Sequence, residues 1–256
     1  MGLHRVAALV EYDGALFRGF QWQKSGRTVQ SELEGALQKL SGPCGRVQAA
    51  SRTDSGVHAR GQVVAFWVRD DLDTATIVRG MNYYLAEDVA LKGACGIDAD
   101  FDVRRRAVSR QYCYTILDSG TRSPLYERIA LRVRHTLDVR RMRAACRLLQ
   151  GVHDFAAFAT SLDEPDLSTV RFVHEARVLR TAELVEFWMT ANAFLRHQVR
   201  NTVGLLVRVG LGKTSVEEFG ALIDGGRQGG VAGPAAVARG LCLVGVSYEP
   251  PLAFAA

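Results

Sequence analysis

The sequence predicts an α+β protein built from two similar halves, divided near residue 103. Three observations lead to this prediction. The chain has 256 residues, 48% of them apolar, which is enough for one large core or two smaller ones. Segments with strand and helix patterns alternate along its whole length. The two halves share a β-α-β-β-α rhythm, although no residue-level repeat supports a duplication.

The first half begins with an apolar, β-branched run at residues 5–12 that ends in Asp-Gly, as a strand followed by a turn does. A helix is predicted next, because apolar residues recur at helical spacing between Thr28, which can cap it, and Gly42, which with the following proline can end it. We then expect, in chain order, a strand at 46–50, a strand at 62–68, a helix at 73–85 and a strand at 88–94.

The second half repeats this rhythm. A helix is predicted at 138–150, with one apolar face and an opposite face that carries four arginines. Loops are expected at 160–170, which is rich in acidic, Ser/Thr and Pro residues, and at 225–240, which is rich in Gly and Ala and lacks the Gly-Lys-Ser/Thr order of a phosphate loop. The other expected elements are strands at 109–117, 129–135, 171–180, 184–191 and 241–248, and helices at 194–210 and 215–224.

Basic residues outnumber acidic ones by 32 to 27, which gives a formal net charge of +5 and favours a polyanionic partner. Twelve arginines and only three acidic residues lie between Arg104 and Arg147. Arginine can grip phosphate through two hydrogen bonds, so this stretch is predicted to form a phosphate-binding surface. Genomic codon bias is an equally good explanation of the arginine excess.

The five cysteines are scattered, with no CxxC pair and no histidine at metal-ligand spacing, so we expect reduced core cysteines and no metal site. The apolar run at the N-terminus is too short and too soon interrupted by Glu11 and Asp13 to be a signal peptide or a membrane span. A cytoplasmic protein is expected.

Residues 52–59 read RTDSGVHA and lie between two predicted strands, where functional residues are often mounted. Local chemistry alone describes a tight turn, because Asp bonds to neighbouring backbone and Gly accepts positive φ. The octapeptide also resembles the GRTDxGVHA catalytic loop of the tRNA pseudouridine synthase A family. Similar agreement is found at 11–14 and 20–23 (EYDG, FQWQ), 28–30 (TVQ), 109–114 (SRQYCY), 151–158 (GVHDFAAF), 194–201 (FLRHQVRN) and 232–241 (AGPAAVARGL), so the resemblance covers nearly the whole chain.

This resemblance implies the pseudouridine synthase fold, in which the antiparallel sheets of two halves meet at a central basic cleft. Residues 1–103 would carry the catalytic Asp loop, and residues 104–256 would carry a tyrosine strand and an arginine helix. The implied reaction is isomerisation of uridine to pseudouridine at positions 38, 39 and 40 of the tRNA anticodon stem-loop. The resemblance further implies a homodimer that uses no cofactor and no catalytic metal.

Asp54 matches the family's catalytic carboxylate, which can act as a nucleophile towards the sugar or as the base that removes a sugar proton. Arg200 would form an ion pair with Asp54, and Tyr112 would stack on the target base and could help to remove its C5 proton. Arg52 would help to extrude that base from its stack, since the bond to the sugar is otherwise out of reach. Taken alone, a helix arginine is usually solvated and a strand tyrosine is usually a packing residue. Tyr114, on the same strand face, is the alternative active-site ring.

Arg196 is expected one helical turn before Arg200 and could contact phosphate, and His58 is expected to order the loop. The chain departs from the family pattern in four places: Ser51 replaces a usual Gly, Ser55 replaces a usual Ala, Arg196 replaces a common Tyr, and residues 233–238 read GPAAVA where GPTAPA is more frequent. None of these changes removes a charged catalytic group.

Three other functions are the alternatives. A pseudouridine synthase that acts on another RNA would have the same chemistry. A non-catalytic tRNA-binding or RNA-folding protein would need neither the intact Asp54 loop nor Arg200. A methyltransferase would need a Gly-rich strand-loop-helix near the start, which the sequence lacks.

Overall fold

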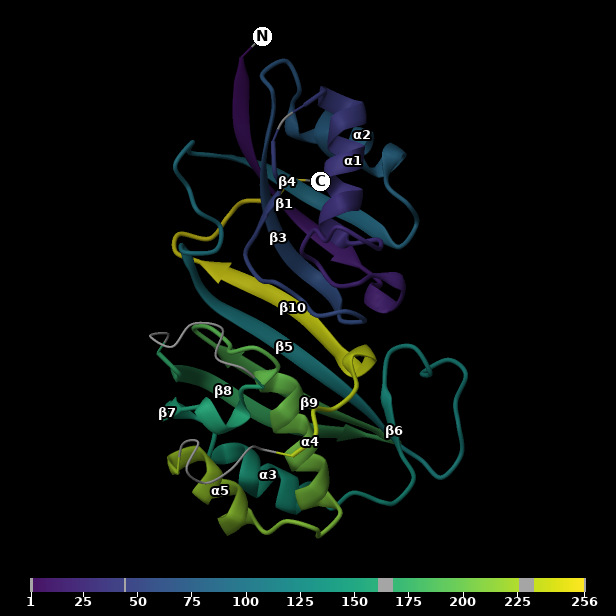
Figure 1. The fold of residues 1–256 in the computed structure, drawn as a ribbon, viewed down its shortest axis with the longest axis vertical. Coiled ribbons are helices and arrows are strands. Elements are labelled where there is room, and N and C mark those ends of the chain that lie inside the picture. Colours follow the sequence, from purple (N-terminus) through teal and green to yellow (C-terminus); the bar gives the residue numbers. More distant parts are fainter. Residues whose placement is uncertain (1, 44, 161–167, 226–232, 256) are drawn as a thin grey trace. The chain divides into compact units, whose positions relative to one another are not determined.

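The computed structural model describes residues 2–43, 45–160, 168–225 and 233–255. The chain forms two compact units (Figure 1): unit 1 is Met1–Arg110 with Cys242–Ala256, and unit 2 is Gln111–Leu241. The relative position of the two units is not determined. The predicted α+β class is confirmed, because each unit combines helices with strands. Of the two predicted loops, residues 161–167 and 226–232 lie outside the described residues.

The strands of unit 1 follow the order β4-β1-β3-β10. The central strand β1 (Leu3–Tyr12) is antiparallel to both β3 (His58–Arg69) and β4 (Val89–Ile97). The short strand β2 (Gln48–Ala49) is antiparallel to β3. In contrast, β10 (Leu241–Tyr248) runs parallel to the start of β3. The expectation of purely antiparallel sheets is therefore wrong. A strand that returns after a long stretch of chain can pair in parallel, whereas a hairpin cannot.

Two helices of unit 1 pack on this sheet, α1 (Val29–Ser41) against β3 and α2 (Thr74–Tyr84) against β4. The predicted caps are present: the Thr28 side chain accepts a hydrogen bond from the amide of Ser31, and Gly42 ends α1 with φ 78°. A short 3₁₀ helix, η1 (Gly14–Leu16), follows β1. Both helix predictions are confirmed, and for α1 the start and stop signals are local in the sequence.

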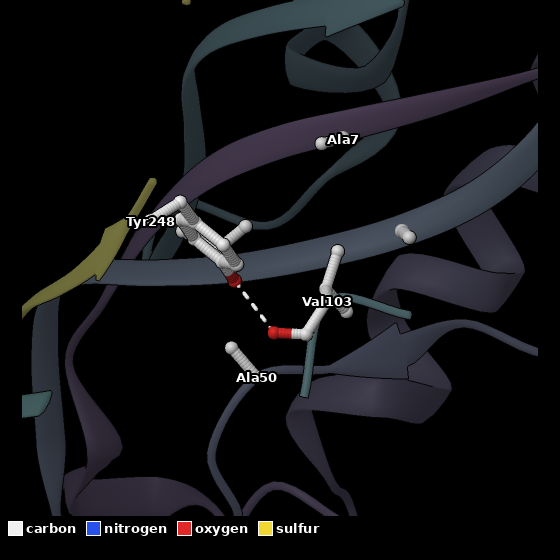
Figure 2. Close-up of a cluster of buried hydrophobic side chains, with 6 residues drawn as sticks. Ala7, Ala50, Val103 and Tyr248 are labelled. Carbon is white, nitrogen blue, oxygen red and sulfur yellow. Dashed lines mark hydrogen bonds between the residues drawn. The ribbon is translucent and has the colours of Figure 1, made fainter. Parts of the chain in front are cut away.

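A cluster of small buried side chains and one tyrosine fills part of the unit 1 core (Figure 2). The hydroxyl of Tyr248, at the end of β10, donates a hydrogen bond of 2.7 Å to the carbonyl of Val103. The members of the cluster are Ala7, Ala50, Val63, Ala65, Val103 and Tyr248. The cluster therefore joins the C-terminal strand to β1, to β3 and to the segment that precedes β5 (Ala107–Asp118).

The strands of unit 2 follow the order β5-β9-β8-β7. The strand β8 (Val170–Thr181) is antiparallel to β9 (Leu184–Ala191) and to β7 (Gly151–Asp154). A second parallel pair joins β6 (Leu131–Val133) to β5. The sequence did not predict β7, whose four residues carry too weak a strand pattern.

The helices of unit 2 are α3 (Val139–Arg147), α4 (Gln198–Gly210) and α5 (Val216–Asp224), and they pack against one another. Among its described residues, the unit also has the 3₁₀ helices η2 (Ala156–Phe158) and η4 (Ala238–Gly240). The predicted start of α4 at residue 194 is wrong by four residues, and α3 ends three residues before the predicted 150.

Four cysteines within the described residues are free thiols, in agreement with the predicted reduced cysteines: Cys95, Cys113, Cys146 and Cys242. The fifth, Cys44, lies outside the described residues. No described helix has the length and apolar character needed to cross a membrane.

Candidate active site

Asp54 lies on the loop between β2 and β3, in unit 1, and is half-buried between the buried residues Thr53 and Val57. The amide of Val57 donates to the carbonyl of Asp54 at 3.1 Å, which closes a tight turn around the carboxylate. The amide of Phe20 donates to the carbonyl of Thr53 at 3.0 Å. The backbone on both sides of Asp54 is therefore fixed by hydrogen bonds.

The segment that follows β1 lies directly against this loop. The carbonyl of Phe17 accepts hydrogen bonds from the Ser55 hydroxyl at 3.1 Å and from the Gly56 amide at 3.3 Å. Gly19 has φ +90°, and a Cβ added there would lie 2.9 Å from the carbonyl oxygen of Thr53. Only glycine fits this backbone contact without displacing the loop.

His58 begins β3 and is buried, with 8% of its surface exposed. Its Nδ1 lies 3.1 Å from the amide nitrogen of Gly14 and 3.0 Å from Oδ1 of Asp13. One ring nitrogen cannot accept from an amide and donate to a carboxylate at once, so the two contacts belong to different proton positions on the ring. In either form His58 contacts the turn after β1. Arg52, two residues before Asp54, is exposed.

The two candidate tyrosines lie on β5 in unit 2, and both are buried. The ring of Tyr112 meets the ring of Phe194 edge to face, with centroids 5.0 Å apart. Tyr114 is fully buried, and its hydroxyl donates to the carbonyl of Val237 at 2.7 Å. Burial raises the pKa of the Tyr114 hydroxyl above its usual value. These surroundings make Tyr114 a core residue.

Arg200 lies in the first turn of α4 and is half-buried. Its Nε donates to the carbonyl of Ala236 at 2.8 Å, and the amide of Ala236 donates to the carbonyl of Arg200 at 3.0 Å. Arg196 is exposed in the turn before the helix. Between them His197 adopts the left-handed conformation with φ 61°. The prediction that Arg196 lies one helical turn before Arg200 is therefore wrong, because a left-handed residue cannot continue an α-helix.

The structure thus brings Arg52, Asp54 and His58 together on one loop and strand start of unit 1. Tyr112, Arg196 and Arg200 lie in unit 2. Sequence reasoning did not single out the side chain of Gln62 or the hydroxyl of Tyr12, both of which bond to this loop. Among the described residues, no three His, Cys, Asp or Glu side chains are grouped so that they could hold a metal ion.

A protein-family model described as tRNA pseudouridine synthase matches residues 8–104 and 145–249 of this chain. Asp54 and Arg200 fall inside the matched ranges, and Tyr112 lies in the gap between the two ranges. A tRNA pseudouridine synthase A from Roseiflexus sp. (strain RS-1) is 44% identical over 251 residues, which cover 96% of this chain and 91% of that protein. The protein of that name from Syntrophotalea carbinolica is 41% identical over 247 residues, which cover 96% of each chain. The one from Chloroflexus aurantiacus is 40% identical over 254 residues, which cover 98% of this chain and 91% of that protein.

Proposed function

Because the chain belongs to the tRNA pseudouridine synthase A family, it is an isomerase that forms pseudouridine in tRNA, and we propose that Asp54 is its catalytic carboxylate. We further propose that its substrates are uridines 38, 39 and 40 of the anticodon stem-loop. One observation carries the assignment of Asp54. Asp54 is half-buried and stands on a turn whose backbone is bonded on both sides to unit 1. A carboxylate held in this way can meet a substrate without first being ordered.

The reaction breaks the bond between uracil N1 and the ribose, rotates the base while it stays bound, and forms a new bond from the ribose to C5. The proton on C5 is lost and N1 gains one, so no redox partner is needed. Asp54 either attacks the ribose as a nucleophile or removes a ribose proton as a base. Both routes need a charged carboxylate in a place from which bulk water is excluded.

The other predicted site residues are proposed to act on the same nucleotide. Arg200 is the cationic partner of Asp54, and Tyr112 stacks on the uracil. Arg52 helps to extrude the base from its stack. Arg196 contacts phosphate, and it can do so from an exposed turn as well as from a helix. His58 orders the Asp54 loop through its contact with Gly14.

Recognition of the tRNA is proposed to rest on the exposed arginines of residues 104–147. All but two of the twelve are exposed; Arg132 is half-buried and Arg110 is buried. We further propose that the protein is a cytoplasmic homodimer and that the arginines of both subunits hold one tRNA. Sedimentation of the free protein tests the dimer, and a monomer would contradict it.

The proposed function is tested by comparing the wild type, Asp54→Ala and a control, Asp71→Ala, in which an exposed carboxylate outside the loop is removed. Each protein is incubated with unmodified tRNA, and pseudouridine is mapped by carbodiimide-blocked reverse transcription. We expect stops at 38, 39 and 40 with the wild type and the control, and none with Asp54→Ala, which still binds tRNA. Equal modification by Asp54→Ala would reject its role. Stops only outside the anticodon stem-loop would favour a synthase for another site.

A further inference from the structure

The chain leaves the sheet of unit 1 immediately before the catalytic loop. Strands β2 and β3 pair in the register Gln48↔Ala65 and Ala49↔Val64. The amide of Ala50 then donates to the carbonyl of Val63 at 2.8 Å. The next step of this antiparallel register places Ser51 opposite Gln62.

At this last step a side chain takes the place of backbone. The amide of Ser51 donates to Oε1 of Gln62 at 3.2 Å, and Nε2 of Gln62 donates to the carbonyl of Ser51 at 2.7 Å. A glutamine amide offers the same donor and acceptor as a peptide group, so it can extend the ladder by one rung while the two backbones separate. Gln62 has no exposed surface, so its polar atoms depend on such partners.

A second buried side chain holds the residue next to Asp54. The hydroxyl of Tyr12 and Oγ1 of Thr53 lie 2.7 Å apart in a hydrogen bond between buried groups. Nε2 of Gln62 lies 3.5 Å from the same Tyr12 hydroxyl, so the two anchors adjoin.

The register of β1 and β3 places both anchors on one face. Strand β1 pairs with β3 at Val10↔Gln62, so the side chains of Val10 and Gln62 lie on the same face of the sheet. Tyr12 follows Val10 by two residues and therefore points to that face too. The register shifts only after this pair, where Tyr12 pairs with Ala59.

We propose that Gln62 and Tyr12 are positioning residues that set the direction of the Asp54 carboxylate, by fixing Ser51 and Thr53 on either side of Arg52. This inference rests on the catalytic role proposed for Asp54. A catalytic group on a loop keeps its geometry when supporting side chains are locked by packing and hydrogen bonds, and a displacement of about 1 Å can cost roughly a hundredfold in rate.

The test uses substitutions that remove the bonds and keep the shape of the side chains. Gln62→Leu removes both bonds to Ser51, whereas Tyr12→Phe and Thr53→Val each remove one side of the same hydrogen bond. The kcat of the folded protein is measured by tritium release from C5-labelled uridine in tRNA. We expect kcat to fall about tenfold or more for Gln62→Leu and about threefold or more for Tyr12→Phe and for Thr53→Val. The double variant of Tyr12 and Thr53 should lose no more than the worse single variant. Binding of tRNA should change by less than about threefold, because the anchors touch the loop and not the RNA.

The matched control is Val64→Ala, which truncates a fully buried side chain on β3 two residues from Gln62. It should lower the midpoint of thermal unfolding while kcat of the folded protein stays within about twofold of the wild type. An equal loss of kcat in this control, or a full kcat in Tyr12→Phe and Thr53→Val, would overturn the inference. The last two variants decide the question even if Gln62→Leu fails to fold. Asp54→Ala, assayed alongside, separates the two proposals: its activity would reject the proposed function, whereas its inactivity beside fully active anchor variants would reject this inference alone.

Discussion

Tyr112 and Tyr114 stand two residues apart on β5, and both are buried. The Tyr114 hydroxyl is bonded to the carbonyl of Val237, and a Cβ added at Gly240 would lie 2.6 Å from the Tyr114 ring. A ring held this tightly cannot turn towards a substrate. The Tyr112 ring instead meets Phe194, just ahead of the helix that carries Arg200.

The first prediction follows from this difference. Tyr114→Phe removes a buried donor from the carbonyl of Val237 and should lower the free energy of unfolding by about 1–2 kcal/mol, with little change in kcat of the folded protein. Tyr112→Phe keeps the ring packing but removes the hydroxyl that we propose helps to remove the C5 proton, so it should lower kcat with a smaller loss of stability. Urea unfolding and the tritium-release assay measure the two quantities. The opposite pattern would show that Tyr114 is the active-site ring.

At this scale, motif resemblance identified residue types but not their partners. The SRQYCY stretch pointed to Tyr112, yet it gave no sign that the neighbouring Arg110 is buried. Its guanidinium donates to the carbonyls of Ala50, Arg104 and Ala107. Arg110 is thus a structural residue of unit 1, not part of a phosphate-binding surface, because a buried cation already bonded to three carbonyls is not presented to RNA.

Among the elements, the loop that carries Asp54 and the segment after β1 interlock through backbone atoms. Gly19 has φ +90° and its missing side chain leaves room for the carbonyl of Thr53, 2.9 Å from where a Cβ would lie. A Cβ added at Gly35, inside α1, would meet nothing within 4 Å. Substitution by alanine should therefore have opposite effects on stability at Gly19 and at Gly35.

The second prediction compares alanine at these two glycines. Gly19→Ala should lower the free energy of unfolding by more than about 1 kcal/mol, because it strains φ and pushes on the loop. It should also lower kcat, since the displaced backbone adjoins Asp54. Gly35→Ala should raise the free energy of unfolding by about 0.5–1 kcal/mol, because alanine favours a helix interior, and leave kcat unchanged. Thermal and urea unfolding with parallel kcat measurements check both. A neutral Gly19→Ala would contradict the interlock.

Element boundaries were predictable where their causes are local. Thr28 and Gly42 mark the ends of α1 in the sequence and cap it in the structure. Strand β3 was expected at residue 62 but begins at His58, because its first residues pair with the distant β10, at Cys242↔His58. Helix α4 was expected from residue 194, but the left-handed His197 prevents a helix from starting before Gln198. Neither cause is visible in a local pattern.

Across the whole molecule, the function was predictable because a long, unusual motif singled out one carboxylate. What supports that carboxylate was not predictable. Gln62 and Tyr12 read as ordinary strand residues, and only the register of three strands brings them under the loop. Sequence patterns report which residues face inward, whereas hydrogen-bond partners depend on pairings between distant segments.

The third prediction concerns the response of stability to alkaline pH. Cys146, on α3, is 1% exposed, and burial raises the pKa of its thiol from 9.0 to about 12, against a smaller opposing effect of the nearby Arg147. Between these two pH values the unfolded chain has lost a proton that the folded chain retains. In this range the folded state binds up to one more proton than the unfolded state. The free energy of unfolding should therefore fall as pH rises from about 9 towards 12.

Cys146→Ala isolates this contribution, because the tyrosines and other cysteines whose pKa values burial also raises remain in both proteins. Urea unfolding of the wild type and the variant at several pH values between 8 and 11 gives the slope of stability against pH, and the variant's slope should be less steep by about one proton. The variant loses some packing at all pH values, which shifts its curve without changing this slope difference. Parallel curves over the range would mean that the thiol ionises in the folded protein, which would contradict its burial on α3, the helix that packs against α4 and β8.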